Sequence, residues 1–255
     1  MSEWLVLLLA MGGACLVVVV ITVAKERRVS DDYDPSETPD VIEYMTMMVG
    51  VVYAIVLGLA IAGVWESRGA AQDGVRTEAQ ALHEVSLRAD AYPAHARERI
   101  RRDVAAYVDH VVNVEWRVML DKGELTERGD ELLNRVRGDV LELRGEDVEA
   151  AQAYPGLLDQ VAAADDARGA RRESAGPTMP SVVWFGLVLG AVLAVGLIFT
   201  LQIRRSPREL MLSGLFSMLI AFLLFLVWDF DAPFGRDVAD AVGPFTDLFP
   251  GARGD

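Results

Sequence analysis

Cysteine is almost absent from this chain of 255 residues, and Cys15 is the single example. One thiol cannot form a disulfide within the chain, and a cysteine-based metal site needs several. Cys15 lies inside an apolar run, where a small buried side chain is expected. Lysine is scarce as well, with Lys25 and Lys122 as its two examples, and no segment is basic enough to predict nucleic-acid binding.

Motifs of catalysis and metal binding are also missing. The chain has no phosphate-binding glycine loop, no nucleophile elbow and no zinc-binding helix motif. Its three histidines are His83, His95 and His110, and they lack the spacing of metal ligands. The sequence therefore predicts a protein that is not an enzyme and that holds no metal and no cofactor.

Long hydrophobic runs dominate what is present, since hydrophobic residues make up 52% of the chain. An apolar helix of about 20 residues spans the hydrocarbon core of a bilayer. The runs predict four transmembrane helices, at residues 4–24, 45–65, 181–203 and 210–228. Tryptophan, which prefers the membrane interface, occurs near the run ends as Trp4, Trp65, Trp184 and Trp228. The predicted fold is an all-α membrane protein in the cell membrane.

The charged residues between the runs predict a water-exposed helical bundle inserted between the second and third spans. The predicted parts are a first transmembrane hairpin (1–65), a helical domain (66–178), a second transmembrane hairpin (179–228) and an acidic tail (229–255). Apolar residues of the domain recur every three or four positions, as in amphipathic helices. One such stripe consists of Ala96, Ile100, Val104, Tyr107, Val111, Val114 and Val118.

Prolines predict where the helices of this domain end. Pro93 is expected to separate two helices, and Pro155-Gly156 is expected to break the chain before the last one. No such residue lies between Trp65 and Val75, so the second span is expected to continue into the domain. Four helices joined by short breaks predict a bundle.

Basic residues in the short loops predict the orientation, because they favour the cytoplasmic side. They are Lys25, Arg27, Arg28, Arg204, Arg205 and Arg208. This distribution places both termini and the helical domain outside the cytoplasm.

Small residues recur at every fourth position of the second span, and this spacing lets membrane helices approach closely. The simpler interpretation is packing within one subunit. The alternative is that this helix lines a pore in an oligomer, with an apolar constriction at Tyr53, Leu57 and Ile61. The candidate pore-lining residues are Gly50, Tyr53, Ala54, Leu57, Gly58, Ile61 and Ala62.

Ionisable residues are missing from the middle of every predicted span. Proton pumps, ion-coupled transporters and voltage sensors normally need one there, whereas a passive pore does not. Acidic residues lie instead at the ends of the spans, as Glu43, Glu66, Asp229 and Asp231. Solvation of helix ends explains them simply. In an oligomeric pore they would form carboxylate rings that attract cations.

Several short motifs in order along the chain resemble the bestrophin-like domain family of bacterial membrane proteins. They are Val51-Val52-Tyr53-Ala54-Ile55-Val56-Leu57-Gly58, Val64-Trp65-Glu66, Glu78, Arg88, Arg99, Tyr107, Glu115-Trp116, Arg168, Arg171, Pro180, Trp184 and Asp231-Ala232-Pro233-Phe234-Gly235. Bestrophins are pentameric channels, mostly for anions. Each subunit has four transmembrane helices and a cytoplasmic helical domain, and the second helix lines the neck of the pore. The resemblance implies this layout.

The function expected from these observations is a homo-oligomeric ion channel with the second span around the pore. The acidic balance, a formal net charge of −14, favours cations. The expected partners are the lipid bilayer, inorganic ions and other copies of the chain, a pentamer by resemblance. The alternative is a membrane sensor or scaffold whose helical domain binds a ligand or a protein partner.

Overall fold

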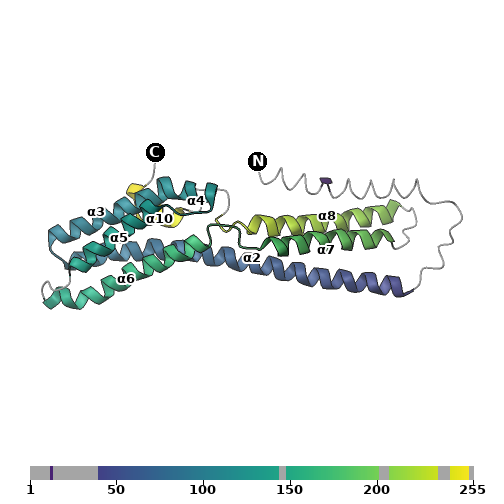
Figure 1. Cartoon of the computed structure of the whole chain (residues 1–255), viewed down its shortest axis with the longest axis horizontal. Coiled ribbons are helices and arrows are strands. Elements are labelled where there is room, and N and C mark those ends of the chain that lie inside the picture. The colour runs from purple at the N-terminus through teal and green to yellow at the C-terminus, as the bar shows by residue number, and fades with distance from the viewer. Residues whose placement is uncertain (1–11, 14–39, 144–147, 201–206, 235–241, 253–255) are drawn as a thin grey trace. The chain divides into compact units, whose positions relative to one another are not determined.

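A computed structural model of the chain describes residues 12–13, 40–143, 148–200, 207–234 and 242–252 (Figure 1). Every regular element in these ranges is a helix. The chain divides into two compact units, each made of two stretches of sequence. The apolar unit comprises Met1–Trp65 and Met179–Asp231, and the helical domain comprises Glu66–Thr178 and Ala232–Asp255.

The longest helix, α2 (Asp40–Arg88), has 49 residues and contributes to both units. No proline occurs between Pro39 and Pro93, so every residue of α2 keeps the N–H that a helical hydrogen bond needs. The predicted continuation of the second span into the helical domain is confirmed. The short 3₁₀ turn η2 (Ala89–Ala91) follows α2 directly.

In the apolar unit, α7 (Ser181–Thr200) and α8 (Pro207–Phe230) lie side by side (Figure 1). Their apolar residues and those of α2 share one core, formed by Tyr53, Leu57, Val64, Leu187, Ala191, Ala194, Ile220 and Val227. Within the described residues, two helices are long and apolar enough to cross a membrane, Tyr44–Ala91 and Met211–Phe230, and Ser181–Leu197 is a shorter apolar helix. The predicted first span, 4–24, lies outside the described residues apart from two positions.

The helical domain has its own core. Its long helices α3 (Ala94–His110), α5 (Glu127–Glu142) and α6 (Val148–Glu173) pack on one another and on the end of α2 (Figure 1). Between α3 and α5 the chain forms the π-helix η3 (Val111–Glu115) and the short helix α4 (Trp116–Lys122). Pro93 is the N-terminal cap residue of α3, as its position in the sequence predicts.

The π-helix corrects the predicted apolar stripe. From Ala96 to Val111 the stripe is buried as expected, but Val114 is 47% exposed and Glu115 is fully buried. A π-turn contains an extra residue compared with an α-turn, so it rotates all following side chains around the helix axis. This rotation brings a carboxylate into the core at the position where the stripe predicted valine.

The break predicted at Pro155-Gly156 is wrong, because α6 continues through both residues. Proline removes one helical hydrogen bond, but buried residues on one side of the following turns hold the helix in place. They are Leu157, Val161 and Ala164.

The predicted acidic tail is not a separate part of the chain. Residues from Ala232 onward belong to the helical domain and include α10 (Gly243–Leu248) and the 3₁₀ turn η4 (Pro250–Ala252). Phe245 is fully buried in the core of the domain, and the ring of Phe234 meets that of Trp116 edge to face, with 5.4 Å between centroids. Because this segment is acidic overall, its composition does not reveal the few apolar residues that attach it to the helical domain.

Candidate functional site: a buried ionic cluster

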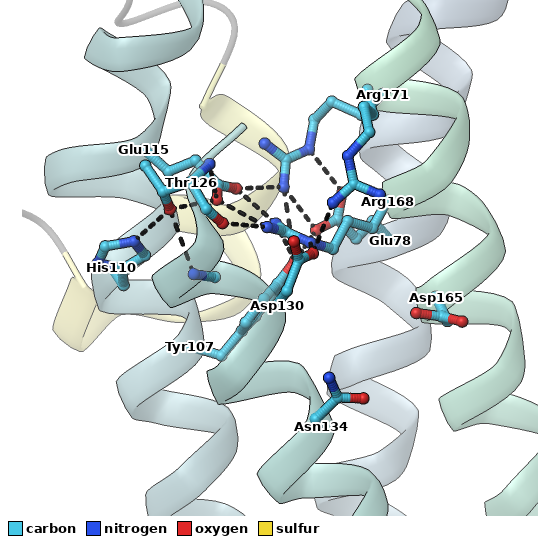
Figure 2. Close-up of polar contacts among 12 residues, drawn as sticks. Glu78, Tyr107, His110, Glu115, Thr126, Asp130, Asn134, Asp165, Arg168 and Arg171 are labelled. Atoms are coloured by element: carbon cyan, nitrogen blue, oxygen red, sulfur yellow. Dashed lines mark hydrogen bonds and ion pairs between the residues drawn. The ribbon is translucent and has the colours of Figure 1, made fainter. Parts of the chain in front are cut away.

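Two carboxylates and two guanidinium groups lie together in the core of the helical domain, as Figure 2 shows. We call Glu78, Glu115, Arg168 and Arg171 the buried ionic cluster, since each of these side chains is at most 2% exposed. They come from α2, η3 and α6. Burial of one unpaired charge is very unfavourable, so such groups are found paired. Here two negative charges meet two positive ones.

Arg171 links both carboxylates. Its Nε donates to Glu78 Oε2 at 2.8 Å and its Nη2 donates to Glu78 Oε1 at 2.9 Å. The same Nη2 is 2.9 Å from Glu115 Oε1. The guanidinium also lies over the ring of Trp116, 5.5 Å from its centroid, where the ring face attracts a cation.

Arg168 pairs with Glu115 in the same two-point manner. Its Nη1 donates to Oε1 at 2.6 Å and its Nη2 donates to Oε2 at 2.8 Å. The remaining donors reach the edge of the cluster, where Nη2 contacts the Thr126 carbonyl at 3.1 Å and Nε contacts Asp130 Oδ1 at 2.9 Å. Two-point pairing fixes the orientation of a planar guanidinium as well as its position.

Tyr107 lies between the two ion pairs. Its hydroxyl donates to Glu78 Oε1 and accepts from Arg168 Nη1 at 3.1 Å. Burial, together with the negative charge of Glu78, raises the pKa of Tyr107 well above its usual value, so the phenol stays neutral. A neutral hydroxyl that both donates and accepts connects the two pairs without adding charge.

The ionised forms of Glu115, Arg168 and Arg171 are stabilised by their partners. Burial alone would raise the pKa of Glu115, but the hydrogen bond from Arg168 and the charge of Arg171 outweigh it and lower that pKa to about 2. Burial alone would lower the pKa values of Arg168 and Arg171, and their carboxylate partners raise them instead. These three groups are therefore charged at neutral pH.

Gly129 makes room for the cluster at the first turn of α5. A β-carbon here would overlap Glu115 Oε2 and the guanidinium of Arg168. The turn is fixed by its N-cap residue Thr126, whose hydroxyl accepts from the Gly129 N–H at 3.2 Å and donates to Glu115 Oε2 at 2.7 Å. The π-helix and this glycine together bring the carboxylate and the guanidinium into contact.

The arrangement is suited to holding helices of the domain together. Every carboxylate oxygen of Glu78 and Glu115 accepts at least one hydrogen bond from the chain. In the described ranges, no group of three or more His, Cys, Asp or Glu side chains is placed to hold a metal ion. Together with Tyr107 of α3, the cluster joins α2, η3 and α6 through charge-assisted hydrogen bonds.

The structure divides the candidate pore-lining residues between two sides of α2. Tyr53 is 8% exposed and Leu57 is 2% exposed, since both pack in the core of the apolar unit. The Tyr53 hydroxyl donates to the Leu187 carbonyl at 3.1 Å. Ile61 is partly exposed and packs against the same core. In contrast, Gly50 is partly exposed and the remaining three are exposed: Ala54, Gly58 and Ala62.

A sequence model of the Bestrophin-like domain matches residues 12–239. The chain belongs to the bestrophin-like family. Among solved structures, it is similar to crystal structures of a bacterial bestrophin homologue from Klebsiella pneumoniae that carry single substitutions. Three of them give TM-scores of 0.67, 0.68 and 0.66 at 14%, 14% and 15% identity, and in each case the match covers 97% of this chain and 99% of the other. A comparison with curated proteins gave no match. At this identity the likeness shows a shared fold.

The predicted mouth charges of this bestrophin-like chain have different surroundings. Glu66 is exposed, and Asp229 is partly buried. Asp231 is 8% exposed and accepts hydrogen bonds from the Met179 N–H at 2.8 Å and from Trp184 Nε1 at 3.0 Å, so it ties the start of α7 to the end of α8. The side chain of Glu43 lies outside the described residues.

The buried ionic cluster was not predicted as a site from the sequence, although all four members and Tyr107 are among the residues that carry the family resemblance. Two signals pointed to them. Arg168 and Arg171 are three residues apart and thus lie on one helix face. Glu115 directly follows an apolar position of the stripe. Neither signal identifies the partner, because Arg171 and Glu78 are separated by 93 positions.

Proposed function

We propose that this bestrophin-like chain forms a homo-oligomeric ion channel and that the membrane part of α2 lines its pore. The observation that carries the proposal is the exposed row of small residues on α2, at Ala54, Gly58 and Ala62. Helices from several copies can approach a common axis closely along such a face. Tyr53 and Leu57 face the core of the apolar unit, about 100° around the helix from Ala54 and Gly58. The proposed lining is therefore Gly50, Ala54, Gly58 and Ala62, with Ile61 at its edge.

We propose four membrane spans, with residues 4–24 as the first and α2, α7 and α8 as the others. Support comes from the tail, since residues on both sides of the second hairpin belong to one helical domain. Thr178 and Ala232 must then lie on the same side of the bilayer. An even number of crossings between them is needed, and α7 and α8 supply two.

We propose that the helical domain and both termini lie outside the cytoplasm, with Lys25, Arg27 and Arg28 in one cytoplasmic loop and Arg204, Arg205 and Arg208 in the other. A reporter that is active only in the cytoplasm, fused after Asp255, should be silent. An active fusion would contradict this orientation and would match the cytoplasmic domain of bestrophins.

The proposed ion preference is for cations. Glu66 is exposed at the end of the spanning part of α2, and copies of it around an axis would form a ring of negative charge. In a KCl gradient across a planar bilayer, the reversal potential should lie toward the K⁺ equilibrium value. Glu66→Gln should move it toward the Cl⁻ value, and an anion-selective wild type would contradict the preference alone.

The channel itself is tested by two matched glycine substitutions. Gly58→Val should reduce the current strongly, because it adds bulk to the proposed lining. Gly63→Val makes the same change about 140° around the helix and should leave the current intact. In the chain, a β-carbon at either glycine meets nothing within 4 Å, so both substitutions fit. Silent bilayers together with a monomer on native mass spectrometry would reject the channel and leave the sensor or scaffold.

A further inference from the structure

His110, the last residue of α3, contacts the edge of the buried ionic cluster through Thr126 (Figure 2). Its Nε2 is 2.7 Å from the Thr126 hydroxyl oxygen. That hydroxyl has two further neighbours, Glu115 Oε2 at 2.7 Å and the Gly129 N–H at 3.2 Å. Three partners around one hydroxyl determine where its proton is.

Proton counting assigns the tautomer of the imidazole. A threonine hydroxyl has one proton and two lone pairs. Ionised Glu115 can only accept, so it takes the hydroxyl proton, and the Gly129 N–H can only donate. His110 must therefore donate from Nε2–H. Its Nδ1 is left without a proton and is the atom that takes one up in acid.

The surroundings of the ring disfavour a second positive charge. Four charged groups face it: Asp109 from α3, Glu115 from η3, Arg128 from α5 and Arg168 from α6. Glu115 is already fully paired with Arg168 and Arg171, and Asp109 accepts from Asn113 at 2.8 Å. Burial, aided by Arg168 and Arg128, lowers the pKa of His110 below its usual 6.5 despite the two acids.

We propose that His110 is a proton-sensing residue of the helical domain. Uptake of a proton at Nδ1 leaves the Nε2–H donor in place but adds a positive charge near Arg128 and Arg168, so the charged ring favours solvent over its site beside Thr126. The Thr126 hydroxyl then loses one of the contacts that hold it in its capping position at the first turn of α5. The contribution of His110 to stability is complete above pH 6.5 and is lost as the pH falls through its lowered pKa, because the unfolded chain binds the proton more readily. The Gly129 N–H, which donates to both the hydroxyl and the carbonyl of Thr126 at 3.2 Å and 3.1 Å, reports the change.

The tautomer is tested by nitrogen NMR on the full chain in detergent micelles with ¹⁵N-labelled histidine. Two of the three histidine signals are assigned with His83→Gln and His95→Gln, and the third then belongs to His110. At pH 7.5 the His110 signal should be that of a ring protonated at Nε2, and it should shift to the doubly protonated form in acid. A ring protonated at Nδ1 at pH 7.5, or one that stays neutral down to pH 5.0, would overturn the proposal. This measurement needs no variant at His110 that folds stably.

Hydrogen exchange tests the consequence. After correction for the intrinsic pH dependence of exchange, protection of the Gly129 amide should fall about threefold to tenfold between pH 7.5 and pH 5.5, the range for partial loss of a cap. His110→Gln keeps an N–H donor but cannot titrate, so its protection should not change with pH. The matched control His95→Gln, at an exposed position of α3, should behave like wild type. An equal pH effect in His110→Gln would overturn the proposal.

Discussion

Arg171 and Glu78 are joined at two points, 2.8 Å and 2.9 Å apart, and neither side chain is exposed. The pair connects α6 to α2 inside the helical domain. When one partner of a buried ion pair is removed, the other remains as an uncompensated charge in the core. Loss of either residue should thus destabilise the domain far more than the loss of a surface pair.

Arg171→Met should lower the free energy of unfolding of the helical domain by about 3–5 kcal/mol. The matched control is Arg172→Met, because this neighbouring side chain is 51% exposed and pairs with Asp130 at the surface. Its loss should cost less than about 1 kcal/mol. Denaturant unfolding in detergent, followed by circular dichroism, measures both.

A double substitution separates charge balance from packing. With Glu78→Leu added to Arg171→Met, Glu115 and Arg168 remain as a neutral pair, and much of the lost stability should return. The opposite outcome is a loss of unfolding free energy in the double variant that equals the sum of the losses in Glu78→Leu and Arg171→Met. In that case uncompensated charge is not the cause.

Gly129→Ala should destabilise the domain by about 1–3 kcal/mol, the usual effect of overpacking. Its β-carbon would overlap Glu115 Oε2 and the Arg168 guanidinium, neither of which is free to move. Gly138→Ala in the same helix is the control, since nothing lies within 4 Å of its β-carbon. Alanine is the better helix former there and should stabilise the domain by about 0.5–1 kcal/mol. If both substitutions change the free energy of unfolding in the same direction, this prediction is wrong.

The stability of the domain should fall in acid as Glu115 takes up a proton. Its pKa is about 2 in the folded chain against an ordinary value of 4.5. The unfolded chain therefore binds the proton first, and the stabilising contribution, complete above about pH 4.5, is lost as the pH falls toward 2. Unfolding free energies of wild type and Glu115→Gln at several pH values between 5 and 3 should show a steeper decline for wild type.

The control for acid is Glu131→Gln, at a side chain that is 63% exposed and paired with Arg128. The unfolding free energy of this variant should decline with falling pH as steeply as that of wild type. Equal slopes in wild type and Glu115→Gln would assign the acid sensitivity to other carboxylates.

Gly190→Ala should destabilise the apolar unit, because its β-carbon would lie 2.6 Å from two ring carbons of Tyr53. Gly186→Ala is the matched control one turn away, with nothing within 4 Å of its β-carbon. Thermal stability in detergent should fall for the first variant and stay close to wild type for the second. Tyr53→Leu combined with Gly190→Ala should recover part of the loss, and no recovery would mean that the ring is not the obstacle.

Helices that are determined by neighbouring residues could be predicted from the sequence. Absence of proline predicted the continuous α2, and the apolar period predicted α3 and α5. The π-helix at Val111–Glu115 has no such signal, because its cause is the pairing of Glu115 with arginines more than 50 positions away. The burial of Tyr53 has no local signal either, because it depends on which side of α2 faces α7.

The packing of Phe245 in the helical domain has a consequence for biosynthesis. The ribosome completes residues 66–178 long before it reaches the segment that closes their core, and α7 and α8 are made in between. Residues 66–178 therefore cannot reach their final packing until the C-terminal segment has also been synthesised. A C-terminal truncation before Phe245 should leave a protein that inserts into the membrane yet exposes apolar surface to quality-control proteases.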